Sequence, residues 1–151
     1  MSTAAPKNVD LPVEPGDRFA IVAARWNAAI IEPMLAACAE RFAEHGANDV
    51  DVHRVPGSYE LPVAAKWAAE SGRYAAVVVL GCVIRGDTAH FEYVAGPCSE
   101  GCMRVQLATG VPVIFGVLTV ENDEQARQRI PNGAAAADAA LEMAALKRGL
   151  E

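Results

Sequence analysis

The sequence is poor in the features that mark membrane, secreted and nucleic-acid-binding proteins. Its longest apolar run, residues 74–84, stops at Arg85 and is far shorter than the roughly 20 residues that a helix needs to cross a bilayer. Residues 1–17 contain proline and acidic residues where a signal peptide has a hydrophobic segment, so we expect a cytoplasmic protein with reduced cysteines. With 13 Lys and Arg against 19 Asp and Glu, the net charge of −6 argues against a broad nucleic-acid-binding surface.

The sequence also lacks several motifs that mark common catalytic sites. It contains no GxSxG nucleophile elbow, no HExxH zinc pair, no dinucleotide-binding GxGxxG and no GxxxxGK[ST] loop for nucleoside triphosphates. Cys98 and Cys102 lie one helical turn apart, a spacing that could suggest a metal site. No further ligands stand at the spacing of a tetrahedral site, so we interpret both as buried hydrophobic residues and expect no bound metal.

The residues that are present are typical of one globular domain with a sizeable core. Of the 151 residues, 52% are hydrophobic and 21% are charged, and a chain of this length needs no disulfide or metal to fold. We expect a Pro-rich, mobile N-terminal arm over residues 1–17, with a short extended piece near 9–13. A single domain should follow over residues 18–151.

Strand-like and helix-like segments alternate through this domain. The sequence predicts four strands, at 19–24, 50–55, 75–82 and 111–119, of which the first and the third are short apolar runs. Helical periodicity, caps and glycine stops predict helices at about 28–46, 61–72 and 90–109, a short one opened by Asn122, and a last one at 133–148. The alternation predicts the α/β class, as a three-layer αβα sandwich of flavodoxin-like type with a mainly parallel four-stranded sheet.

Parallel sheets of this class bind ligands beyond the carboxyl ends of their strands, and four segments with unusual residues should meet there. These segments are 25–27, 56–60, 83–90 and 115–121. Trp26 directly follows the first strand, either as a hydrophobic plug or as a platform for a planar heterocycle. Asn27 either caps the next helix or takes part in the site.

Residues 85–90, with the sequence RGDTAH, are the most informative of these segments. Gly86 permits a tight turn, and backbone N–H groups at a helix start bind anions, with the Thr88 hydroxyl as a further donor. His90 follows this turn and could transfer protons near neutral pH, although a structural role fits the pattern as well. We place the other histidines, His45 and His53, at a helix end and on a strand surface.

Four motifs in one register resemble the lumazine synthase family. They are RWN at 25–27, PGSYELP at 56–62, GCVIRGDTAHFEYVA at 81–95 and FGVLTVENDEQA at 115–126, and the resemblance covers residues 18–151. It implies an enzyme of the penultimate step of riboflavin biosynthesis. This family condenses 5-amino-6-(D-ribitylamino)uracil with 3,4-dihydroxy-2-butanone 4-phosphate, giving 6,7-dimethyl-8-ribityllumazine, phosphate and water, without a metal or organic cofactor.

The resemblance also implies roles for individual residues. Those expected to bind the ribitylaminouracil are Trp26, Asn27, Ser58, Tyr59, Glu60, Cys82, Val83, Ile84 and Phe115, the last contributed by a neighbouring subunit. Those expected to bind the butanone phosphate are Gly86, Asp87, Thr88 and Arg129. His90 matches the proton-transfer histidine of the family.

By the same resemblance, the active site is shared between subunits of a homopentamer or a multiple of five, and riboflavin synthase is a candidate downstream partner. Residues 129–133 form a shorter loop than is usual in the family and lack its lysine. In the family, this lysine would supply a second cationic contact to phosphate, and the loop decides whether rings assemble into a shell. Two alternatives are a non-catalytic lumazine or flavin binder, or shell protein, of the same fold and a flavodoxin-like signalling domain. His90, Thr88 and Arg129 argue against the first, and the missing acidic pocket after the first strand argues against the second.

Overall fold

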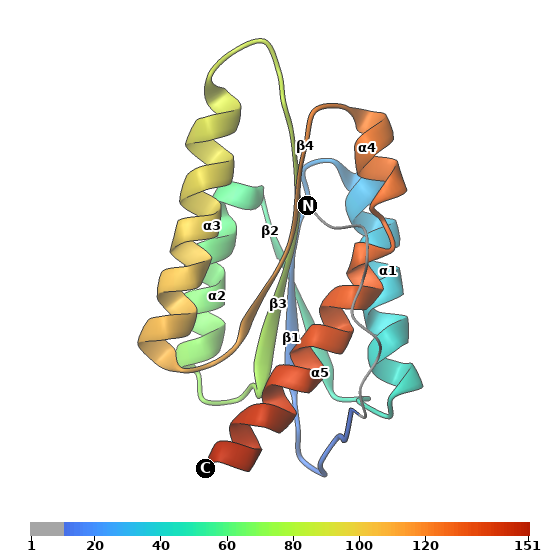
Figure 1. The fold of residues 1–151 in the computed structure, drawn as a ribbon, viewed down its shortest axis with the longest axis vertical. Coiled ribbons are helices and arrows are strands. Elements are labelled where there is room, and N and C mark those ends of the chain that lie inside the picture. Colours follow the sequence, from blue (N-terminus) through green and yellow to red (C-terminus); the bar gives the residue numbers. More distant parts are fainter. Residues whose placement is uncertain (1–10) are drawn as a thin grey trace.

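The computed structural model describes residues 11–151, in which a four-stranded sheet lies between two layers of helices (Figure 1). The strands are β1 (Phe19–Ala24), β2 (Val50–Val55), β3 (Ala76–Ile84) and β4 (Val113–Val120). The helices are α1 (Ala28–Glu44), α2 (Leu61–Glu70), α3 (His90–Thr109), α4 (Asp123–Gln128) and α5 (Asn132–Leu150), with a 3-10 turn, η1 (Ser58–Glu60), before α2. Helices α2 and α3 pack together on one face, and α1 and α5 pack together on the other (Figure 1).

The sheet has the strand order β2-β1-β3-β4, and all three pairings are parallel. The α/β class and the four-stranded parallel sheet are therefore confirmed. β3 begins one residue later and ends two residues later than the sequence predicts, because Val83 and Ile84 continue the ladder opposite Thr119 and Val120. The prediction that this strand ends at residue 82 is wrong, and the loop to α3 begins at Arg85.

Each face of the sheet has its own hydrophobic core. Phe19, Ile21 and Ala23 of β1 pack in the core beneath α1 and α5, while the alternate residues of this strand pack beneath α2 and α3. Alternation of side chains along a strand sends neighbours to opposite faces. A strand covered on both sides must therefore be apolar throughout, which explains the continuous apolar runs of β1 and β3.

The helix ends follow most of their sequence signals. α1 stops before Gly46, which has a φ of 79°, and His45 lies at this helix end as predicted. Asn122 caps α4 by accepting a hydrogen bond from the backbone N–H of Gln125. The side chain of Gln125 accepts a hydrogen bond from the N–H of Glu121 and not from that of Asn122, so the return bond of a capping box is displaced by one residue.

Residues 11–17 run along the domain without regular secondary structure. Leu11 is buried in the core beneath α1 and α5, and Asp17 accepts a 2.7 Å hydrogen bond from Arg148 near the end of α5. The extended piece expected near 9–13 lies partly outside the described residues, and its described part forms no strand. Within residues 11–151, none of the helices combines the length and the apolar character that crossing a membrane would require.

Candidate active site

A cavity of about 710 Å³ opens at the carboxyl ends of β1 and β3, where the sequence predicts a ligand site. Its walls come from the end of β1, the η1 turn, the end of β3 and the first turns of α3. The lining residues are Trp26, Asn27, Pro56, Gly57, Ser58, Tyr59, Glu60, Cys82, Val83, Ile84, His90, Tyr93 and Val94. Nine of the predicted uracil-binding and catalytic residues are thus brought together, and Phe115 is not among them.

Trp26 forms a wall of the cavity and is 74% exposed. Its backbone N–H donates to the carbonyl of Pro56 at 3.1 Å, so the residue is fixed beside the η1 turn although its ring is free. A side chain this exposed does not plug the core. Of the two interpretations from sequence, the geometry favours an accessible aromatic platform.

Asn27 connects two walls of the cavity. Its backbone has a φ of 62°, in the left-handed region that a residue with a short polar side chain can adopt. Its side chain makes no cap to α1, so the capping interpretation is wrong. Instead, Nδ2 donates a 2.8 Å hydrogen bond to the carbonyl of Cys82, which holds the segment after β1 against the end of β3.

The η1 turn is shaped by short contacts within itself and with β3. The carboxylate of Glu60 accepts a 3.0 Å hydrogen bond from the N–H of Gly57, while Tyr59 is exposed. Ser58 is buried directly over Gly81 of β3, where an added Cβ would lie only 2.5 Å from the Ser58 Oγ. Glycine at position 81 therefore makes room for the turn that carries Ser58.

Cys82 lines the cavity, while its side chain packs in the core beneath α1 and α5. Burial, assisted by the nearby charge of Asp123, raises the pKa of its thiol to about 11. The thiol is therefore protonated at neutral pH, and since the thiolate is the nucleophilic form, Cys82 is not an activated nucleophile. Its contribution to the cavity is shape and backbone.

The first turns of α3 supply His90, Tyr93 and Val94. Sequence reasoning found His90 but missed the other two. They follow it at positions i+3 and i+4, which lie on the same face of a helix, so His90 itself was the signal that could have identified them. The N–H of His90 donates to Thr88 Oγ1 at 3.3 Å, which ties the helix start to the preceding loop.

The predicted phosphate-binding residues lie outside this cavity. Gly86, Asp87 and Thr88 are exposed in the loop that joins β3 to α3. Arg129 stands at the C-terminal end of α4, where its guanidinium donates to the carbonyl of Gln125. The structure thus places the loop next to the cavity and Arg129 on a separate element at the β4 side of the sheet.

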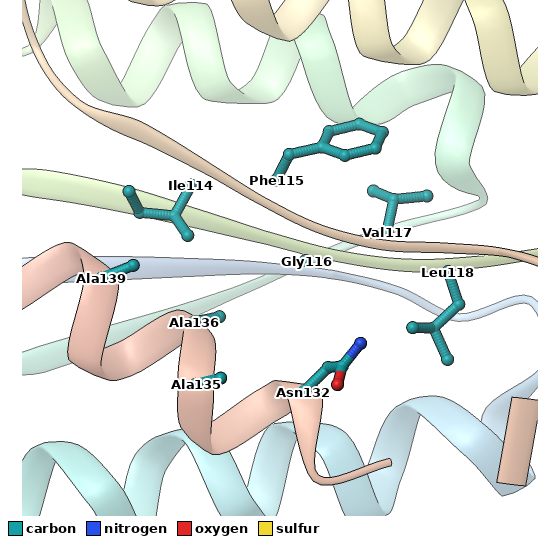
Figure 2. A pocket seen from close by; sticks show the side chains of 9 residues that line it. All are labelled: Ile114, Phe115, Gly116, Val117, Leu118, Asn132, Ala135, Ala136 and Ala139. Atoms are coloured by element: carbon teal, nitrogen blue, oxygen red, sulfur yellow. The ribbon is translucent and has the colours of Figure 1, made fainter. Parts of the chain in front are cut away.

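Phe115 lies in the first half of β4 and not at its carboxyl end, so the expected location of this residue is wrong. It borders a second cavity, of about 330 Å³, together with residues of β4 and the start of α5. Figure 2 shows Phe115 and Val117 pointing away from α5, while Ile114 and Leu118 point to its side. Phe115 is 39% exposed, so its ring is partly accessible from outside the subunit.

No metal ligand set accompanies these cavities within residues 11–151, where no group of three or more His, Cys, Asp or Glu side chains could hold an ion. Cys98 and Cys102 are free, buried thiols in the core beneath α2 and α3.

Comparison with known proteins identifies close relatives of this chain. A profile of the family described as 6,7-dimethyl-8-ribityllumazine synthase matches residues 16–148. A protein of that name from Xanthomonas oryzae pv. oryzae is 53% identical over 117 residues, which cover 76% of each chain. Another from Xylella fastidiosa is 48% identical over 138 residues, covering 87% of this chain and 90% of its relative.

Proposed function

The chain belongs to the 6,7-dimethyl-8-ribityllumazine synthase family and has that family's activity in riboflavin biosynthesis, and we propose a role in this reaction for each residue of the candidate site. The reaction joins a ribitylaminouracil to a butanone phosphate with loss of water and phosphate. Because both substrates are reactive, positioning should account for most of the catalysis. The gathering of Trp26, the η1 turn, the end of β3 and His90 around one cavity carries the proposal.

The cavity at the ends of β1 and β3 binds the ribitylaminouracil. Trp26 stacks on the pyrimidine ring, for which its exposed indole is suited. The backbone of Cys82, Val83 and Ile84 pairs with the pyrimidine edge, while Ser58, Tyr59 and Glu60 hold the ribityl chain. A carboxylate accepts hydrogen bonds from sugar hydroxyls, and Glu60 already accepts one from the N–H of Gly57.

The loop before α3 binds the phosphate of the second substrate. Gly86, Asp87 and Thr88 precede a helix of 20 residues, whose free N–H groups and dipole favour an anion. Thr88 adds a hydroxyl donor. Arg129 completes the site with a guanidinium fork, which binds phosphate in a bidentate manner.

His90 moves protons between the substrates. Imine formation must protonate a departing hydroxyl, and elimination of phosphate must remove a proton from carbon. An imidazole does both near neutral pH. His90 lines the uracil cavity and its backbone contacts Thr88 of the phosphate loop, so it stands where the two substrates would meet. The Cys82 thiol, with a pKa of about 11, is unsuited to this task.

Phe115 and Arg129 act in the site of a neighbouring subunit. Neither residue lines the cavity that contains Trp26 and His90, although both are accessible from outside the chain. A homopentamer, or a multiple of five, would bring the β4 side of one copy to the cavity of the next. Four free cysteines fit a reducing compartment, so we place this assembly in the cytoplasm.

Subunit complementation tests the shared site. His90→Ala and Arg129→Ala are each expected to be nearly inactive when made alone, as followed by lumazine fluorescence and phosphate release. Co-expression of the two should form mixed rings in which about a quarter of the sites combine an intact His90 with a neighbour's intact Arg129. Recovery of activity toward this level, with native masses in multiples of five, supports the model. Mixed rings that stay inactive would show that each site lies within one chain.

A further inference from the structure

Arg85 joins three elements at the edge of the proposed phosphate site. Its backbone N–H donates to the carbonyl of Val120 at 2.9 Å, which extends the β3–β4 ladder by one hydrogen bond. Its guanidinium pairs with Glu92 in the first turn of α3 and, through Nε at 3.1 Å, with Glu121 just after β4. It also lies over the ring of Phe91, 4.2 Å from the centroid.

The loop that Arg85 brackets has little packing of its own. Residues 85–90 are all exposed, and a Cβ added at Gly86 would meet no atom within 4 Å. The hydrogen bond from the His90 N–H to Thr88 Oγ1 is confined to the loop and the helix start. The path of the loop is therefore set by its two ends, and Arg85 links these ends by pairing with Glu92.

The same contacts occupy most of the Arg85 guanidinium, so Arg85 is not the group that we assign to the phosphate. One side of the fork is taken by Glu92, and Nε is taken by Glu121. Hydrogen bonds to Arg85 hold the pKa of Glu92 below its usual range, so this carboxylate remains charged at neutral pH. Without the guanidinium, two carboxylates would face an anion site with no compensating charge.

We propose that Arg85 is a positioning residue for recognition of the phosphate-bearing substrate, a proposal that rests on the phosphate site proposed above. The Arg85–Glu92 pair fixes the path of residues 86–88 and the start of α3. The positive charge of Arg85 also cancels the charge of Glu92 and Glu121 beside the bound phosphate. Arg85 does not contact a substrate and acts only through the loop and the two carboxylates.

The test uses the full-length enzyme, with steady-state kinetics for each substrate and inorganic phosphate as a competitive inhibitor. Arg85→Ala should raise the KM for the butanone phosphate and the inhibition constant of phosphate by about tenfold, because two exposed ion pairs are lost and two carboxylates are left uncompensated. The KM for the uracil should stay within about twofold, since Arg85 does not line that cavity. The matched control is Arg104→Ala, which breaks the ion pair of an exposed arginine within α3 with Glu100. It should change neither the KM for the butanone phosphate nor the inhibition constant of phosphate.

A charge-balanced variant separates the two parts of the proposal. Arg85→Ala combined with Glu92→Gln and Glu121→Gln removes the uncompensated carboxylates but leaves the loop unclamped. This triple variant should recover part of the lost phosphate affinity. The inhibition constant of phosphate should depend more strongly on salt in Arg85→Ala than in the wild type, and this difference should disappear in the triple variant. Arg85→Lys, which keeps the charge without the fork, should lie between the wild type and Arg85→Ala.

Three results would overturn the proposal, and they separate it from the proposed function. Equal rises of both KM values in Arg85→Ala, in an enzyme with unchanged native mass and melting temperature, would show a general effect and no positioning of phosphate. Unchanged phosphate inhibition in Arg85→Ala, with weaker inhibition in Thr88→Val, would remove the role of Arg85 alone. Unchanged inhibition in both Thr88→Val and Arg129→Lys would remove the phosphate site itself, and the role of Arg85 with it.

Discussion

Replacing Gly81 by alanine should disturb both the stability of the domain and the binding of the ribitylaminouracil. The added Cβ would lie 2.5 Å from Ser58 Oγ, 3.0 Å from Leu61 Cδ1 and 3.3 Å from Val117 Cγ1. The first distance is too short for any real contact, so the Ser58 side chain or the η1 turn must shift, whereas the other two contacts require movements of a few tenths of an ångström. Overpacking of this kind costs about 1–3 kcal/mol of unfolding free energy.

A double-mutant cycle with Ser58→Ala isolates the contact that matters most. Ser58→Ala removes the Oγ that the new methyl group would meet, so Gly81→Ala should cost about 1 kcal/mol less in the Ser58→Ala background. Urea unfolding measures these free energies, at one fixed protomer concentration because an oligomer gains stability with concentration. The KM for the uracil should rise in Gly81→Ala, since Ser58 belongs to the proposed ribityl-binding turn, and the KM for the butanone phosphate should not.

Gly96→Ala is the matched control for this substitution. Gly96 lies within α3, and a Cβ added there meets no atom within 4 Å. Alanine at this position should stabilise the helix by about 0.5–1 kcal/mol, because glycine is a poor helix former. If Gly81→Ala leaves the free energy of unfolding and the uracil KM unchanged, or if the two substitutions in the cycle are simply additive, the steric reasoning is refuted.

The fold could be predicted from the sequence because its main signal, burial of the strands, is local. β1 begins and ends where its apolar run begins and ends, and β2 has the predicted bounds although it contains Asp51, His53 and Arg54. The prediction that β3 ends at residue 82 was wrong although the apolar run continues to Ile84, where the strand ends. An apolar run does not by itself separate a strand from the start of a loop, and the pairing of Val83 and Ile84 with β4 decides between them.

Parts of the site were predicted for similar reasons, and parts were not. Trp26 and His90 follow directly from strand ends and helix starts, so their meeting at one cavity could be anticipated. The amide of Asn27 had two possible partners, a helix N–H and a distant carbonyl, and sequence alone does not choose between them. Its hydrogen bond to Cys82, with φ at 62°, shows that tertiary contact prevailed over local capping. For Arg85 the partners come from two other elements, and neither is visible as a pair in the sequence.

Three further substitutions or treatments test the proposed chemistry. His90→Ala should lower kcat by about 100-fold with little effect on either KM, and a kcat of the variant equal to that of the wild type would refute the proton-transfer role. Arg129→Lys keeps the charge but loses the fork, so it should weaken the butanone phosphate more than the uracil, and equal weakening of both would point to another ligand. Cys82 should resist iodoacetamide in the folded enzyme at pH 8, because a thiol with a pKa of about 11 is ionised to only about one part in a thousand there and is also buried. Peptide mapping should find Cys82 modified only as the pH approaches 11 or after unfolding in urea, and rapid modification at pH 8 would contradict a thiol that is buried and protonated.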